Sequence, residues 1–128
     1  MPLDIVFAYG SLKRGFSNHH VIADSKFLGA GQTRVDFTMF DLGRYPGVIH
    51  GHSVIAGDVF AVPPRLMGRL DRLEDNGRVY QRKRTLIVMA SGSVEAWIYL
   101  YLLARGAERT VTPRGGVVTW MESLARGP

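Results

Sequence analysis

Six short runs of β-forming residues, separated by Gly, Asp or Pro, constrain the fold of this chain more than any other feature of its sequence. The runs are Asp4–Tyr9, Phe27–Thr33, Asp36–Asp41, Ser53–Val62, Tyr80–Met89 and Val94–Leu103. Ala90-Ser91-Gly92-Ser93, between the last two runs, indicates the turn of a β-hairpin. Many strands and few helices, in an order that does not alternate strictly, favour an α+β fold whose sheet curls into a small mixed β-barrel.

Only two helices are predicted. The clearer one begins at Pro63-Pro64, because proline lacks the N–H that would be unsatisfied in a first helical turn, and runs to about Asp75 before Asn76-Gly77. A second, shorter helix is predicted from Val117 to Ala125. The length of 128 residues is that of one ordinary domain, so we expect a single domain over residues 1–128.

Composition excludes several classes of protein. Hydrophobic residues make up 46% of the chain and charged residues 21%, which is typical of a globular domain and not of a disordered one. The longest apolar run, Ala96–Ala104, is far shorter than the roughly 20 residues that span a bilayer. Met1-Pro2-Leu3-Asp4 lacks the basic start of a secretory signal, so we expect a cytoplasmic protein. The absence of cysteine excludes disulfides, a thiolate nucleophile and cysteine-based metal sites.

The net charge of +5 is compatible with an anionic small molecule or with nucleic acid. Basic residues are scattered, and the one dense cluster is Arg78, Arg82, Lys83 and Arg84. Such a cluster is typical of a solvated basic face. A non-catalytic small-ligand or nucleic-acid-binding barrel that uses Arg78–Arg84 is the alternative function, and its affinity for nucleic acid would fall steeply with added salt.

One face of the predicted helix holds the most informative residue. At about 100° per residue, four residues form an apolar stripe: Leu66, Met67, Leu70 and Leu73. The opposite side carries charge: Arg65, Arg69, Arg72 and Asp75. Glu74 falls within the apolar stripe, so its carboxylate should face the barrel interior, unlike those of Asp71 and Asp75. Desolvation would raise its pKa and make it a candidate acid or base; the alternative is a helix-terminal Glu that turns to solvent or pairs with an arginine.

The first strand is followed by Tyr9-Gly10-Ser11-Leu12-Lys13-Arg14-Gly15. Glycines allow positive φ angles and turn successive N–H groups toward one point, which suits a carboxylate or an oxyanion. The segment lacks the pattern of a P-loop or a dinucleotide fingerprint. The alternative is a plain tight turn.

Histidine chemistry is less favoured. Ser11 could be a nucleophile with His19 or His20 as its base. The sequence around it lacks the G-x-S-x-G pattern, and no carboxylate is placed to orient the histidine, so Ser11 is predicted to be a turn or capping residue. His50 and His52 share one face of an extended segment, but no third metal ligand is recognisable. The sequence therefore requires no metal.

Together, five segments resemble the gamma-glutamylcyclotransferase-like family. They are Tyr9–Gly15, Tyr45-Pro46-Gly47-Val48, Gly57-Asp58-Val59-Phe60, Leu70-Asp71-Arg72-Leu73-Glu74 and Tyr80-Gln81-Arg82. The resemblance covers nearly the whole chain except about the last twenty residues. The sequence is similar to the small branch of this family that includes gamma-glutamylamine cyclotransferase.

The resemblance implies a small mixed β-barrel with a cavity and a small-molecule gamma-glutamyl substrate. It implies an enzyme that cyclises this substrate to 5-oxoproline, a transferase- or lyase-type reaction that releases the attached amine without a cofactor or metal. The implied substrate-binding loop comprises Tyr9, Gly10, Ser11 and Leu12, and the implied catalytic acid/base is Glu74.

Three tyrosines and two loops are further candidates for lining and covering the predicted pocket. Hydroxyls of Tyr80, Tyr99 and Tyr101 are candidates for the pocket lining, although alternation does not say which point inward. Gly43–Gly51 and Arg105–Gly116 are flexible by composition and are lid candidates.

Overall fold

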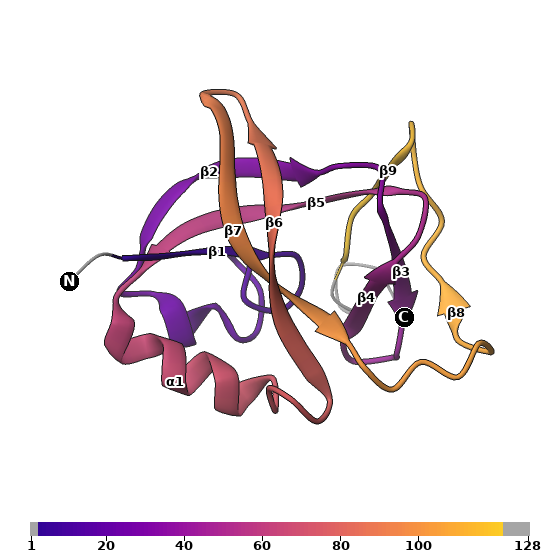
Figure 1. Cartoon of the computed structure of the whole chain (residues 1–128), viewed down its shortest axis with the longest axis horizontal. Coiled ribbons are helices and arrows are strands. Elements are labelled where there is room, and N and C mark those ends of the chain that lie inside the picture. Colours follow the sequence, from indigo (N-terminus) through magenta and orange to yellow (C-terminus); the bar gives the residue numbers. More distant parts are fainter. Residues whose placement is uncertain (1–2, 122–128) are drawn as a thin grey trace.

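A computed structural model describes residues 3–121. Its elements are β1 (Asp4–Ala8), a 3-10 helix η1 (His19–Ile22), β2 (Lys26–Thr33), β3 (Phe37–Asp41), β4 (Pro46–His50), β5 (Val54–Val62), α1 (Pro64–Leu73), β6 (Tyr80–Met89), β7 (Gly92–Tyr101), β8 (Arg109–Thr110) and β9 (Val117–Val118). Figure 1 shows α1 lying along one end of the strands and the β3–β4 hairpin lying at the other. All six predicted strands are present, with shifts of a few residues at their ends.

Five strands close into a barrel. They follow the order β1-β7-β6-β2-β5, and β1 pairs with β5 to complete the ring. The strand β1 runs antiparallel to β5 and parallel to β7, so the barrel is mixed. Closure leaves none of these five strands with a free edge, which removes a common route to aggregation. The predicted α+β barrel is confirmed.

The longest pairing is the β6–β7 hairpin, from Tyr80 opposite Tyr101 to Met89 opposite Gly92. Only two residues connect the strands, and Gly92 has a φ of +126°, a conformation that glycine adopts without strain. The predicted hairpin is confirmed, with β7 ending at Tyr101 so that Leu102 and Leu103 lie beyond it.

A second sheet, β4-β3-β8, packs beside the barrel. The strand β4 was not predicted, because Pro46 and Gly47 interrupt its short apolar run. It forms because Val48, which is fully buried, pairs with Met39 of β3. Both lid candidates therefore contain a strand, since Gly43–Gly51 includes β4 and Arg105–Gly116 includes β8, which pairs with the end of β3.

The helix α1 packs its apolar face on the barrel. Leu66, Met67 and Leu70 are buried in a cluster with Phe60 and Tyr99. The last predicted member of the stripe, Leu73, is 42% exposed, because the helix ends there and the chain turns away. No helix within residues 3–121 is long and apolar enough to cross a bilayer.

The predicted second helix is wrong over its described part. Val117 and Val118 instead form β9, which runs parallel to the start of β5. The positive φ angles of Gly115 and Gly116 turn the chain, and Val118 and Trp120 are buried in the larger core cluster. Burial of β-branched residues beside a strand thus outweighs helical propensity. Residues 122–125 of this prediction lie outside the described residues.

Candidate active site

A cavity of about 450 Å³ lies between the loop after β1, the β3–β4 hairpin and the C-terminal end of α1. Its lining residues are Phe7, Ala8, Tyr9, Gly10, Ser11, Leu12, Asn18, Leu42, Tyr45, Pro46, Leu73, Glu74, Asp75, Val79, Tyr80, Tyr99 and Tyr101. Most are apolar or aromatic, and two are acids. The volume suits a small molecule.

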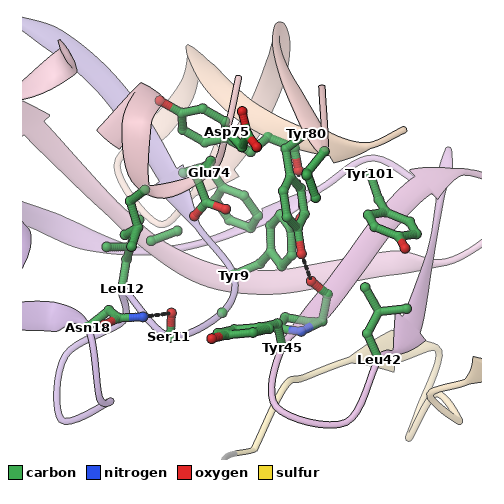
Figure 2. Close-up of a pocket in the computed structure, with 17 residues that line it drawn as sticks. Tyr9, Ser11, Leu12, Asn18, Leu42, Tyr45, Glu74, Asp75, Tyr80 and Tyr101 are labelled. Atoms are coloured by element: carbon green, nitrogen blue, oxygen red, sulfur yellow. Dashed lines mark hydrogen bonds between the residues drawn. The ribbon is translucent and has the colours of Figure 1, made fainter. Parts of the chain in front are cut away.

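Glu74 is the residue immediately after the last helical residue of α1. Its backbone N–H donates to the Leu70 carbonyl oxygen at 2.9 Å, so it still belongs to the last helical turn. Figure 2 shows its carboxylate pointing into the cavity toward Tyr9 and Leu12. Burial raises the pKa of this carboxyl to about 7. Within residues 3–121 the carboxylate has no ion pair or hydrogen bond, and nothing there offsets its desolvation.

The predicted contrast between Glu74 and its acidic neighbours is wrong for Asp75 and correct for Asp71, which does not line the cavity. Asp75 also lines the cavity, because its φ of +50° turns the chain back after the helix. Asp71 is half-buried, and its carboxylate accepts a hydrogen bond from the Tyr99 hydroxyl at 2.7 Å. Helical periodicity does not describe the residues after Glu74, because the chain leaves helical geometry at Asp75.

The loop after β1 faces Glu74 across the cavity (Figure 2). Gly15 adopts the expected positive φ of +80°, whereas Gly10 is required for a different reason: a Cβ there would lie 2.9 Å from Pro46 Cγ. The backbone N–H groups of Ser11 and Leu12 donate no hydrogen bond within residues 3–121. They are therefore available to an oxyanion or a carboxylate.

Tyrosine hydroxyls brace the cavity walls. Tyr9 donates to the Tyr99 carbonyl oxygen at 2.6 Å, and Tyr80 donates to the Pro46 carbonyl oxygen at 2.7 Å. Burial raises the pKa of both phenols above the ordinary value, so both stay protonated as donors. The structure brings Tyr80, Tyr99 and Tyr101 to the same cavity.

His19, His20 and His50 lie in structural contacts. His19 Nδ1 is 3.0 Å from the Leu12 carbonyl oxygen, and His20 Nδ1 is 3.2 Å from the Ser17 carbonyl oxygen. The Ser11 hydroxyl instead accepts from Asn18 Nδ2 at 2.9 Å, so no Ser–His pair forms. His50 stacks on Phe37, and no group of three possible metal ligands lies together in the described part of the chain.

The gamma-glutamyl cyclotransferase, AIG2-like family model matches residues 6–117 of the sequence. The chain belongs to this family. A Vibrio cholerae protein provisionally named a gamma-glutamylcyclotransferase is 39% identical over 97 residues, covering 76% of this chain and 81% of that protein. The gamma-glutamylcyclotransferase family protein YtfP of Escherichia coli K12 is 33% identical over 97 residues, covering 75% and 80%.

Solved structures agree on the fold. A mouse AIG2-like protein superposes with a TM-score of 0.76 at 23% identity, covering 96% of this chain and 99% of that one. The solution structure of Escherichia coli YtfP gives a TM-score of 0.63 at 30% identity, covering 88% and 94%. The cavity thus belongs to a gamma-glutamylcyclotransferase-family barrel.

Sequence reasoning missed part of the site. Asn18, Leu42 and Tyr45 line the cavity from loops that carry no periodic pattern. Tyr45 lies within one of the family-like segments, which is the signal that points to it. Nothing local singles out Asn18, because its contact with Ser11 depends on how the loop folds back.

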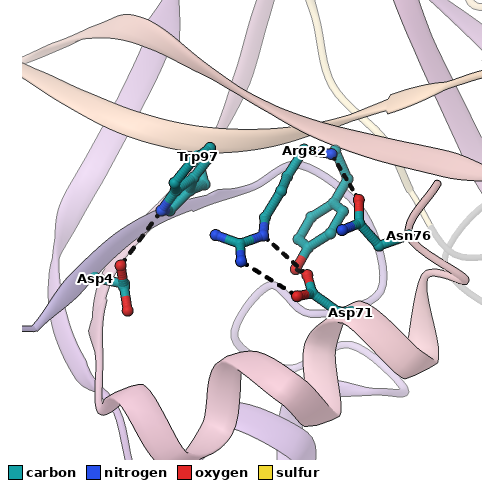
Figure 3. Close-up of polar contacts among 6 residues, drawn as sticks. Asp4, Asp71, Asn76, Arg82 and Trp97 are labelled. Atoms are coloured by element: carbon teal, nitrogen blue, oxygen red, sulfur yellow. Dashed lines mark hydrogen bonds and ion pairs between the residues drawn. The ribbon is translucent and has the colours of Figure 1, made fainter.

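The basic cluster Arg78–Arg84 is partly neutralised. Arg78 binds Asp75 through its Nε at 2.7 Å. Arg82 binds Asp71 and lies over the Trp97 ring at 4.3 Å from its centroid (Figure 3). Arg84 also stacks on Trp97, at 4.7 Å. Two of the four positive charges therefore have carboxylate partners, which weakens the case for a nucleic-acid surface.

Proposed function

We propose that this protein cyclises a gamma-glutamyl compound to 5-oxoproline and releases the attached amine or amino acid, with Glu74 as general acid/base. One observation carries the proposal: a buried carboxyl with a pKa of about 7 faces the two available N–H groups of Ser11 and Leu12 across a cavity of small-molecule size. A pKa near the operating pH suits a group that both accepts and donates a proton.

The reaction needs a nucleophilic amine, a stabilised oxyanion and a protonated leaving group. Glu74 accepts a proton from the substrate α-ammonium, and the resulting amine attacks the γ-carbonyl carbon of the same molecule. The N–H groups of Ser11 and Leu12 donate to the oxyanion of the tetrahedral intermediate. The bond between the γ-carbon and the original nitrogen then breaks, Glu74 returns its proton to the departing nitrogen, and the second proton of the attacking nitrogen passes to water.

Positioning supplies much of the rate, because nucleophile and electrophile belong to one molecule. Holding the substrate folded back in the near-attack geometry removes most of the conformational entropy cost of ring closure. The tyrosines whose hydroxyls are bound to backbone carbonyls, Tyr9 and Tyr80, make the walls rigid. The leaving group has no role in this chemistry beyond accepting a proton.

The test is release of 5-oxoproline from a panel of gamma-glutamyl amino acids, gamma-glutamylamines, gamma-glutamyl-ε-lysine and glutathione, with the native protein and Glu74→Gln. The substitution keeps the shape and removes the proton carrier. We expect turnover of at least one compound by the native protein, and a loss of kcat of about 100-fold or more in the variant, the usual range for a general acid/base. Silence across the panel, or equal activity of the variant, would contradict the proposal.

A further inference from the structure

Glu74 lies at the C-terminal end of α1, where a helix has the fewest hydrogen bonds to stabilise it. The helix α1 ends at Leu73, and the next residues leave helical geometry, with positive φ at Asp75 and Gly77. Helix ends fray because their last carbonyl groups lack partners within the helix. A proton carrier in this place needs external support, and its own carboxylate has no partner within residues 3–121.

The support comes from residues on both sides of Glu74. Three residues earlier, Asp71 accepts the Tyr99 hydroxyl at 2.7 Å and Arg82 Nε at 3.0 Å on Oδ1, and Arg82 Nη2 at 3.2 Å on Oδ2. Two residues later, Asn76 Oδ1 accepts the backbone N–H of Arg82 at 3.0 Å. Figure 3 shows Arg82 reaching from the strand to both points.

This network has the character of a rigid clamp. Both carboxylate oxygens of Asp71 are used, and an arginine that binds both oxygens is geometrically specific as well as strong. The side chains of Arg82 and Asp71 are 24% and 26% exposed, so solvent screens the pair less than a surface ion pair. The Trp97 ring covers the guanidinium at 4.3 Å and restricts its movement.

The same network reaches the opposite wall of the cavity. Tyr99 lines the cavity and is 3% exposed, and its backbone carbonyl oxygen accepts the Tyr9 hydroxyl at 2.6 Å. Burial, followed by the hydrogen bond to Asp71, raises the pKa of the Tyr99 phenol, so it remains a donor. The end of α1 and the loop that begins at Tyr9 are thereby tied to the same residue of β7.

We propose that Asp71, held by Arg82 and Tyr99, is a positioning residue that places the Glu74 carboxylate opposite the Ser11–Leu12 loop. The inference rests on the proposed function, in which Glu74 transfers the proton. Asp71 does not line the cavity and touches no reacting atom, so its effect passes through the position of Glu74.

The test compares Asp71→Asn and Tyr99→Phe with a matched control, Asp36→Asn. Asp36 is also paired with an arginine, Arg34 at 3.8 Å, but this pair is on the surface, with 65% and 62% exposed side chains. Tyr99→Phe removes one donor to Asp71 and keeps the ring and the backbone carbonyl. Thermal melting identifies a temperature at which each variant is folded, and kinetics are measured there on the best panel substrate.

We expect Asp71→Asn to lower kcat about tenfold or more with a KM change below about threefold, because a misplacement near 1 Å can cost up to about 100-fold. Tyr99→Phe should lower kcat in the same direction by less, and Asp36→Asn should match the native protein. The rising limb of the pH–rate profile should move to lower pH in Asp71→Asn, since a displaced Glu74 is less desolvated. The titratable groups that face Glu74 are Tyr9, Tyr80 and Tyr99, with Asp75 beside it.

Native kcat and an unshifted pH profile in both variants, even with lowered melting temperatures, would overturn the positioning role and leave a purely structural pair. If Asp71→Asn does not fold, Tyr99→Phe decides alone by the same two readouts. Glu74→Gln separates the two proposals. An active Glu74→Gln contradicts the proposed function, whereas an inactive Glu74→Gln beside a fully active Asp71→Asn and Tyr99→Phe contradicts only the positioning role.

Discussion

At the scale of single residues, surroundings rather than residue type distinguish the acids of α1. Asp71 and Glu74 are three positions apart, and both lie near the cavity. Asp71 has an arginine and a tyrosine hydroxyl as partners, whereas Glu74, also half-buried, has no such partner within residues 3–121. Its pKa consequently rises to about 7, and this makes the same chemical group suitable for proton transfer near neutral pH.

The first prediction at this scale concerns the pH dependence of activity. The proposed mechanism requires the Glu74 carboxylate, and this form dominates only above its pKa of about 7. We therefore expect kcat/KM to rise with pH through a limb near 7 and to fall tenfold per pH unit well below it, as for one essential group. A kinetic titration in buffers of constant ionic strength measures the limb.

The control is residual turnover by Glu74→Gln, which should lack that limb. A limb at about 4.5, the ordinary pKa of a glutamate, would mean that burial does not perturb the pKa of the Glu74 carboxyl.

At the scale of elements, the site depends on how closely the loop after β1 meets β4. A Cβ at Gly10 would lie 2.9 Å from Cγ and 3.1 Å from Cδ of Pro46, so the loop backbone approaches the proline ring as only a glycine permits. The Tyr80 hydroxyl holds Pro46 from the other side through its carbonyl oxygen. The β3–β4 hairpin and the loop therefore keep one spacing across the cavity mouth.

Replacement of Gly10 by Ala should disturb this spacing. The added methyl group must push the loop or β4 apart, which moves the Ser11 and Leu12 N–H groups relative to Glu74. We expect kcat/KM to fall about tenfold or more, by the cost of misplacing reacting groups. Steady-state kinetics with the best panel substrate measures this loss.

The matched control is Gly68→Ala on the exposed side of α1, where the nearest atom to an added Cβ is Arg72 Nη1 at 3.6 Å. Alanine favours a helix over glycine by about 1 kcal/mol, so this control should melt slightly higher and keep full activity. Equal activity of Gly10→Ala and Gly68→Ala would show that the contact with Pro46 does not matter for the site.

At the scale of the whole molecule, the barrel bears the free-energy cost of a buried acid. One core cluster fills the space between the barrel and the second sheet, and the other lies beneath α1. Closure of β1 on β5 and the packing of α1 together build the walls that desolvate the Glu74 carboxyl. The folded state consequently binds the Glu74 proton more tightly than the unfolded chain does, and ionisation of Glu74 lowers the stability of the fold.

Stability should therefore depend on pH through this residue. The folded pKa of about 7 lies above the ordinary value of 4.5, so stability contributed by the protonated form is fully present below about 4.5 and is lost as pH rises through about 7. The difference corresponds to about 3 kcal/mol, at about 1.4 kcal/mol per pKa unit. Urea unfolding of the native protein and Glu74→Gln at pH 5 and pH 8 measures most of this difference.

We expect the native protein to lose stability relative to Glu74→Gln between these two pH values. A constant difference would show that Glu74 titrates alike in the folded and unfolded states.

Much of the architecture follows from local pattern. Strand-forming runs and their Gly, Asp and Pro boundaries predict six of the strands, because these preferences are properties of neighbouring residues. The proline start and the apolar stripe predict α1, and the stripe predicts that Glu74 faces inward. The family-like segments predict the loop that faces it. These features depend on residues within about ten positions of one another and can therefore be predicted from the sequence by itself.

Other features, among them two strands and the surroundings of both acids, depend on contacts between residues far apart in the chain, and only the tertiary structure determines them. Val117 and Val118 have no local reason to be a strand until the start of β5 lies beside them, and β4 forms because Val48 is buried against the barrel. Asp71 acquires its partners only when β6 and β7 bring Arg82 and Tyr99 alongside the helix. The proton affinity of Glu74 likewise belongs to the closed barrel, since desolvation is a property of everything that surrounds a group and not of its neighbours in sequence.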